Sequence, residues 1–209
     1  MRNGTKIVEE APRRLRGRPR SFETGEVLER VRRVFMDKGF AAASLDELSE
    51  AAGLNRPSLY AAFGDKEQLY IATLRHYGAR AVEGLEAILG GGGPIEKRIG
   101  QVFKTVIDLY TAPPRAAGCM IIGTAAVEAP THPRIATAAG ELLEAIEKCF
   151  ERAFVRAVAS RELGGDPAPS ARARMAGAVL DTLAIRARIG ARPNVLKAFA
   201  ASMVPTICR

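Results

Sequence analysis

The chain has 209 residues, of which 47% are apolar, and it carries a formal net charge of +8. It contains no apolar run of about 18 or more residues, which excludes a transmembrane helix, and its charged N-terminus lacks the apolar segment of a signal peptide. Its three cysteines are odd in number and widely spaced, which excludes a disulfide framework or a zinc pattern and favours a cytoplasmic, reducing compartment.

Residues 1–20 form a basic arm with seven Lys or Arg against two Glu, whereas residues 21–80 carry eight basic and nine acidic side chains. Around the Gly-Arg-Pro of this arm lie Arg16, Arg18 and Arg20. We expect these arginines to contact DNA, either inside the minor groove or at phosphates. The alternative is a solvated tail.

Helix-forming residues dominate the rest of the chain and alternating β-type runs are absent, so we predict an all-α fold. The first helix is predicted over residues 22–38. Its inner stripe holds Val27, Leu28, Val31, Val34 and Phe35, and Gly39 ends it.

Two short helices joined by a tight turn are predicted within residues 44–66. Ser44 and Glu47 have the spacing of a capping box, and Gly53 suits the left-handed turn at the end of the first helix. Pro57 fits the first turn of the second helix, and Gly64 ends that helix. This pattern predicts a helix-turn-helix, in which the second helix enters the major groove of DNA.

The second short helix turns Leu59 and Phe63 toward the core, which leaves Asn55, Arg56, Pro57, Ser58, Tyr60 and Ala62 free for contact. Arg56 is the candidate base reader, because a guanidinium can bond to two acceptors of guanine; a phosphate contact is the alternative. Asn55 is suited either to a base contact or to capping the helix.

A long helix is predicted over residues 66–89, followed by four glycines that break the chain. Further helices are predicted over residues 94–111, 116–129, 133–161, 170–189 and 193–206. The helix at 116–129 is apolar almost all round, which indicates a buried helix, whereas the last two are amphipathic.

The run GRPR and the stretch GFAAASLDELSEAAGLNRPSLYAAFGDKEQLY resemble the DNA-binding domain of the TetR family of bacterial repressors, over about residues 17–70. Beyond them, the chain is similar to the family in its helical layout and in the stretch GCMIIGTAAVEA. The resemblance implies a DNA-binding domain at 21–65 and a regulatory and dimerisation domain at 66–209. It also implies that the DNA backbone is held by Ser44, Ser58, Tyr60 and Lys66.

We therefore expect a repressor that binds a palindromic operator in double-stranded DNA as a homodimer and is released by a small hydrophobic effector. The alternative is a protein that coats DNA without sequence preference, using the basic arm. The candidate effector site is lined by Tyr77, Phe103, Ile107, Tyr110, Met120, Ile121, Thr124 and Phe150. The candidate dimer interface contains Val179, Thr182, Leu183, Phe199 and Met203.

The sequence offers no constellation typical of an enzyme. Its two histidines are isolated, its glycine run lacks the residues of a phosphate-binding loop, and no metal-ligand spacing appears. We therefore predict no catalytic site, no metal and no cofactor. Cys119 permits two interpretations, a redox sensor or a small buried hydrophobe.

Overall fold

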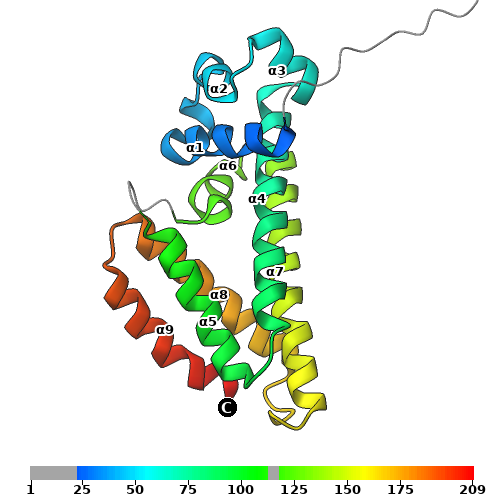
Figure 1. The fold of residues 1–209 in the computed structure, drawn as a ribbon, viewed down its shortest axis with the longest axis vertical. Helices are drawn as coiled ribbons and strands as arrows, with labels where there is room; N and C mark the ends of the chain where they lie inside the picture. Colours follow the sequence, from blue (N-terminus) through cyan, green and yellow to red (C-terminus); the bar gives the residue numbers. More distant parts are fainter. Residues whose placement is uncertain (1–22, 113–117) are drawn as a thin grey trace, which may run out of the picture.

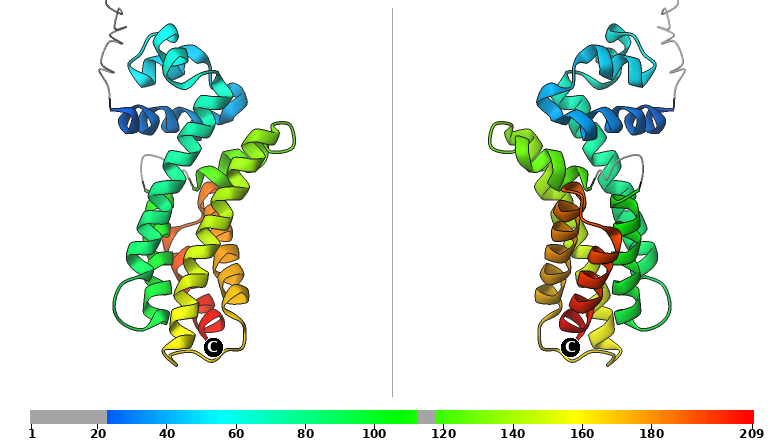
Figure 2. Two further views of the ribbon diagram at one scale, coloured as in Figure 1. Left: turned by 90° about the vertical axis from the view of Figure 1, so that its right-hand side faces the viewer. Right: turned by 90° about the vertical axis from the view of Figure 1, so that its left-hand side faces the viewer.

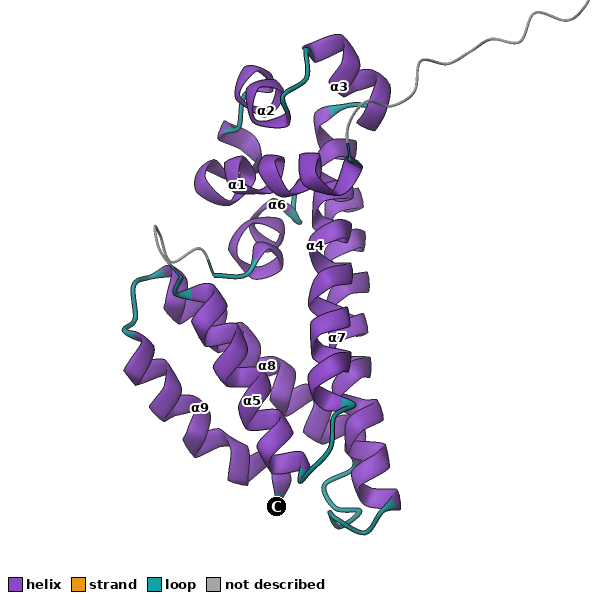
Figure 3. Ribbon diagram, in the orientation of Figure 1, coloured by secondary structure: helices purple, strands orange, loops and turns teal. Residues whose placement is uncertain are grey.

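The computed structural model describes residues 23–112 and 118–209. Every regular element in these two ranges is a helix (Figure 3), which confirms the all-α class. None of the described helices combines the length and the apolar character needed to cross a bilayer. The predicted arm contacts Arg16, Arg18 and Arg20 lie outside the described residues.

Three helices gather at one end of the molecule (Figure 1): α1 (Thr24–Ala42), α2 (Leu45–Ala52) and α3 (Arg56–Phe63). The predicted break at Gly39 is present, because its φ of 78° interrupts α1 before one further turn. The core of this end contains an aromatic cluster among aliphatic side chains. The Tyr70 ring meets Phe35 and Phe40 edge-on, at centroid distances of 4.9 and 5.2 Å.

Helix α4 (Lys66–Leu89) joins this end to the rest of the chain, and its bounds agree with the prediction. It runs beside α7 (Pro133–Ala159), as Figures 1 and 2 show. Gly78 permits the close approach of the two helices, because a Cβ at this position would lie 2.2 Å from a methyl carbon of Leu142. The N-terminal helices therefore continue directly into the larger domain.

The larger domain is completed by α5 (Ile95–Tyr110), α8 (Pro169–Arg188) and α9 (Pro193–Cys208), which pack against one another. Their ends differ from the predicted ones by one or two residues, as does the end of α7. These helices and α7 share a core of buried apolar side chains. Examples are Ile99, Phe103, Phe154 and Leu183. The C-terminus lies at the end opposite α3 (Figure 2).

The predicted helix at 116–129 is corrected by the structure. Gly118 and Cys119 are not helical, and helix begins only at Met120. A π-helix, η1 (Ile121–Ala125), follows and continues into the single turn α6 (Ala126–Glu128). Gly118 has a φ of 66°, and a Cβ there would lie 2.9 Å from the Ala184 carbonyl of α8. This tight, left-handed position explains why the helix cannot start earlier.

Arg172, in the first turns of α8, is fully buried. Its guanidinium donates to four main-chain carbonyls. The distances are 2.9 Å to Pro167, 2.6 Å to Ile207, 3.0 Å to Asp166 and 3.5 Å to Gly164. One side chain thus connects α8, the preceding loop and the end of α9.

Candidate nucleic-acid interface

The predicted capping box of α2 is confirmed. The Glu47 amide donates to the Ser44 hydroxyl oxygen at 3.3 Å, and the Ser44 amide donates to the Glu47 carboxylate at 3.1 Å. Hydrogen bonds from Lys38 and from Ser44 lower the pKa of Glu47 to about 2. The predicted turn residue Gly53 has a φ of 67°. Helix α2 is therefore fixed at both ends by local sequence.

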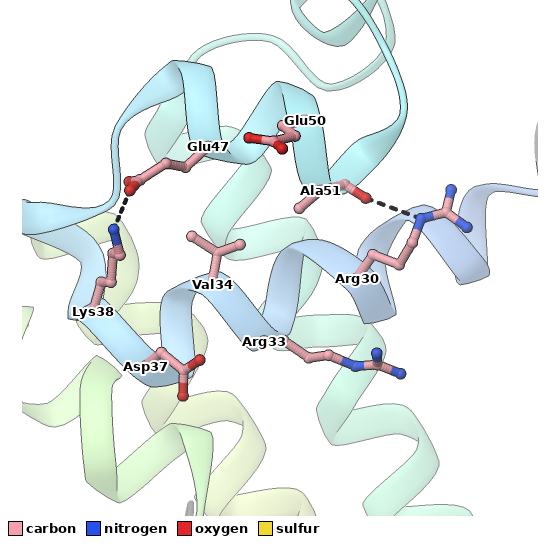
Figure 4. A pocket seen from close by; sticks show the side chains of 8 residues that line it. All are labelled: Arg30, Arg33, Val34, Asp37, Lys38, Glu47, Glu50 and Ala51. Atoms are coloured by element: carbon pink, nitrogen blue, oxygen red, sulfur yellow. Dashed lines mark hydrogen bonds and ion pairs between the residues drawn. The ribbon is translucent and has the colours of Figure 1, made fainter. Parts of the chain in front are cut away.

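Helix α1 holds the other side of α2. Arg30 donates from Nε to the Ala51 carbonyl at 3.0 Å and from Nη2 to the Ala52 carbonyl at 3.1 Å, so it satisfies the C-terminal end of α2. A groove of about 460 Å³ runs between the two helices (Figure 4). Its lining mixes both signs of charge, with Lys38 paired to Glu47, so it offers no uniformly basic surface for a phosphate backbone.

Helix α3 presents the predicted contact residues on its outer side. Asn55 serves as the cap, because its Oδ1 accepts from the Ser58 amide at 2.9 Å; this settles its local role in the free chain. Leu59 is buried beneath the helix as predicted. The predicted contact residues of this segment are all exposed: Asn55, Arg56, Pro57, Ser58 and Tyr60. A cap, a buried anchor and an open face are what a reading helix requires.

Arg56 has a partner that the sequence analysis missed. Its Nε lies 2.8 Å and its Nη2 lies 2.5 Å from Oδ1 of Asp46, in the first turn of α2. Both side chains are more than half exposed. The two residues are ten positions apart on different helices, and no local signal links them. The candidate base reader is thus held by a carboxylate.

Lys66, predicted to contact the DNA backbone, begins α4. Its Nζ donates to the Ala41 carbonyl at 3.1 Å and lies 4.8 Å from the centroid of the Phe40 ring. Burial lowers the pKa of Lys66, and the nearby Glu128 carboxylate opposes that effect. The ammonium group is therefore held at the junction between α1 and α4, at the same end of the chain as α3.

A buried hydrogen bond joins the first turns of α4 to η1. Thr124 of η1 donates to the Met120 carbonyl at 2.8 Å, so its oxygen accepts from the Tyr70 hydroxyl of α4 at 2.6 Å. Burial raises the pKa of Tyr70 to about 12, so the phenol keeps its proton. Beside this bond, the rings of Phe40 and His132 meet edge-on with centroids 4.8 Å apart. The π-helix is therefore part of the contact between the N-terminal helices and the larger domain.

This hydrogen bond is open to a direct test. We expect Tyr70→Phe to lower the free energy of unfolding by about 1–2 kcal/mol, because it leaves a buried hydroxyl without its donor. Thr124→Val should cost a similar amount, and the double variant should lose less than the sum. Chemical unfolding measures all three. Tyr60→Phe is the control, since Tyr60 is 42% exposed; additive losses would contradict a direct bond.

In the part of the chain that the structure describes, most of the candidate effector-site residues are packed in the core. Phe103, Ile107, Met120 and Phe150 are packed in the core, each at most 1% exposed. Tyr110 and Ile121 border a cavity of about 30 Å³, together with Cys119 and Asp181. That volume holds about one water molecule.

Cys119 is buried, as its hydrophobic interpretation requires. Its thiol lies beside the hydroxyls of Tyr77 and Tyr110, from α4 and α5. Burial raises the pKa values of both phenols well above their ordinary value, and the neighbouring thiol raises these pKa values further. Burial, and then the carboxylate of Glu147, raise the pKa of Asp181.

The candidate dimer residues fall on two different faces. Val179 and Leu183 point into the core of the chain itself, at 3% and 0% exposure, and are not available to a second chain. Thr182, Phe199 and Met203 are half-buried at the surface. Thr182 belongs to a stripe on the outer face of α8 and its C-cap, in which residues are spaced alternately by four and three: Ala171, Met175, Ala178, Thr182, Ile185 and Ile189.

Known proteins resemble this chain in sequence and fold. Residues 27–73 match the family model for bacterial regulatory proteins of the tetR family. An uncharacterised HTH-type transcriptional regulator of Bacillus subtilis, YezE, is 30% identical over 154 residues, which cover 72% of this chain and 77% of that protein. The HTH-type transcriptional repressor BdcR of Escherichia coli is 34% identical over 116 residues, covering 56% of this chain and 59% of BdcR.

Solved structures extend the likeness to the whole fold. A cysteine mutant of the TetR family transcriptional regulator CifR, complexed with 26-base-pair operator DNA, superposes with a TM-score of 0.82 at 26% identity. The match covers 90% of this chain and 98% of the CifR chain. The helix-turn-helix and the larger helical domain are therefore similar together, and not as separate pieces.

Proposed function

The chain belongs to the TetR family of bacterial transcriptional regulators, and from this premise we propose that it is a cytoplasmic repressor that binds a palindromic operator as a homodimer. The observation that carries the proposal is the capped helix-turn-helix, whose second helix exposes Arg56 and its neighbours above a buried Leu59. BdcR, a repressor, and CifR, complexed with operator DNA, support this function. We assign DNA binding to residues 21–65 and to the start of α4, and regulation and dimerisation to residues 66–209.

The homodimer is supported by the outer faces of α8 and α9. The stripe on α8 from Ala171 to Ile189 has the alternating spacing at which helices pack against each other. On α9, Val195 is 51% exposed, and the guanidinium of Arg186 on α8 lies 5.6 Å from the ring centroid of Phe199. A pair of such faces around a two-fold axis forms a four-helix contact.

A selection of binding sites from random DNA, followed by footprinting, tests the function. We expect palindromic sequences, because two reading helices related by a two-fold axis meet two inverted half-sites. Recovery of unrelated sequences, with an affinity that depends only on salt, would instead establish the DNA-coating alternative.

Single substitutions separate base reading from backbone contact. Arg56→Ala should lower discrimination between operator and random DNA by about 1–3 kcal/mol per half-site, because it removes a pair of hydrogen bonds to guanine. Lys66→Ala should weaken binding to all sequences and reduce the salt slope by about one for each phosphate that is no longer neutralised. Titrations at several salt concentrations measure both. Equal losses on operator and random DNA for Arg56→Ala would contradict base reading.

We further propose that a small hydrophobic effector releases the DNA. The apolar core around α5, η1 and α7, with a few polar groups such as Tyr110 and Thr124, supports this ligand class. Since the cavity beside Tyr110 holds only about 30 Å³, the effector site must open in the released state. Helix α4 connects that core to Lys66. A screen of hydrophobic compounds for loss of operator binding, repeated on Phe103→Ala and Tyr110→Ala, tests this proposal.

A further inference from the structure

The geometry of the Arg56–Asp46 pair determines which donors of Arg56 stay free. Oδ1 of Asp46 accepts from Nε and forms an ion pair with Nη2, and these two nitrogens lie on one edge of the guanidinium. Arginine has five N–H donors in a rigid plane. The remaining donors, on Nη1 and on the far side of Nη2, point outward from the tip of the side chain. Two donors in this arrangement match the O6 and N7 acceptors of guanine in the major groove.

The charge of Asp46 affects the two possible uses of Arg56 differently. A free guanidinium is attracted to any phosphate, and that attraction carries no sequence information. A guanidinium paired with a carboxylate has little net charge, so its attraction to phosphate falls, while its directional hydrogen bonds to a base remain. Asp46 also lies near the interface, where an unpaired carboxylate would be repelled by the DNA.

Fold stability does not account for this pair. The side chains of Arg56 and Asp46 are 54% and 76% exposed, and ion pairs at such exposure contribute little to stability. The caps of both helices are formed by other residues, Ser44 with Glu47 and Asn55. The pair can therefore be removed without unfolding either helix.

We propose that Asp46 is a positioning residue that determines specificity: it directs the end of the Arg56 guanidinium to a guanine and keeps it from phosphates. This inference rests on the proposed function, since it requires a preferred operator. Asp46 would act through Arg56 alone and would not itself touch the DNA.

The test compares Asp46→Ala with a matched control, Glu50→Ala. Glu50 is one turn further along the same helix, is exposed and carries the same charge, but none of its bonds involves Arg56 in the described structure. In Asp46→Ala, we expect the ratio of operator to random-DNA affinity to fall about tenfold. The salt slope on random DNA should steepen by about one per protomer, because the released Arg56 gains a phosphate. Glu50→Ala should leave the ratio and slope near wild type.

A second arm shows whether Asp46 acts through Arg56. In an Arg56→Ala background, adding Asp46→Ala should leave the affinity ratio unchanged, because no guanidinium remains to be positioned. A further tenfold loss there, or identical behaviour of Asp46→Ala and Glu50→Ala, would overturn the inference. The selection of binding sites with the wild-type protein separates the failure of the proposed function from the failure of the role of Asp46. If the wild type selects no palindrome, the proposed function fails. If it selects one, the variants test the role of Asp46 alone.

Discussion

Replacing Ile185 by aspartate is expected to convert the proposed homodimer into monomers and to lower operator affinity by at least about 1,000-fold. Ile185 is 50% exposed on the outer stripe of α8. Packing of two protomers about a two-fold axis would bury this side chain against the partner. A buried, unpaired carboxylate at such a contact is strongly unfavourable. A monomer meets one half-site only, so most of the margin between specific and non-specific binding disappears.

The matched control is Val155→Asp. Val155 is also 50% exposed, but it lies on α7 near the connection to the start of α8, whereas Ile185 is near the end of α8. Sedimentation should show a dimer for wild type and Val155→Asp and a monomer for Ile185→Asp, and operator titration should follow the same division. An Ile185→Asp protein that stays dimeric at micromolar concentration would place the interface elsewhere.

The sequence predicted the helix-turn-helix well because its signals are local. The capping box at Ser44, the left-handed Gly53 and the cap at Asn55 each act within three or four residues. Such signals determine where a helix begins and ends whatever packs against it. The bounds of α4 were predicted for the same reason.

Features set by tertiary packing were predicted less well. The stretch around η1 is apolar on all sides, so the spacing of its apolar residues does not show which face is buried. It therefore predicts neither the π-helix nor the tight contact at Gly118. On α8, the strongest apolar stripe included Val179 and Leu183, which face the core. The outer stripe holds small residues such as Ala171 and Ala178, which carry a weak hydrophobic signal.

Long-range polar contacts leave no local signal in the sequence. The bond between Tyr70 and Thr124 spans 54 residues, and the pair of Arg56 and Asp46 joins two helices across a turn. Arg172 carried no local sign of burial, because arginine is normally a surface residue. Each of these contacts depends on how separate helices are placed, which propensity and spacing do not encode.

Replacing Arg172 by methionine is expected to lower the free energy of unfolding by about 3–5 kcal/mol. Methionine roughly preserves the length of the side chain but removes every donor, so buried carbonyls of the 164–167 loop and of Ile207 lose their partner. Hydrogen bonds from a charged donor contribute about 1.5–3 kcal/mol each, and a stranded buried acceptor adds a desolvation penalty. For a chain of this size, the melting temperature should fall by roughly 10 °C.

Lysine at this position should rescue only part of the loss, because its single ammonium cannot reach carbonyls arranged around the planar fork of arginine. Arg33→Met is the control: Arg33 is exposed on α1, and its replacement should change the melting temperature by no more than about 1–2 °C. Because Arg172 binds the end of α9, at the opposite end of the molecule from α3 (Figure 1), the folded fraction of Arg172→Met should keep its operator preference. Equal melting of the Arg172 and Arg33 variants would show that the buried guanidinium does not stabilise the fold.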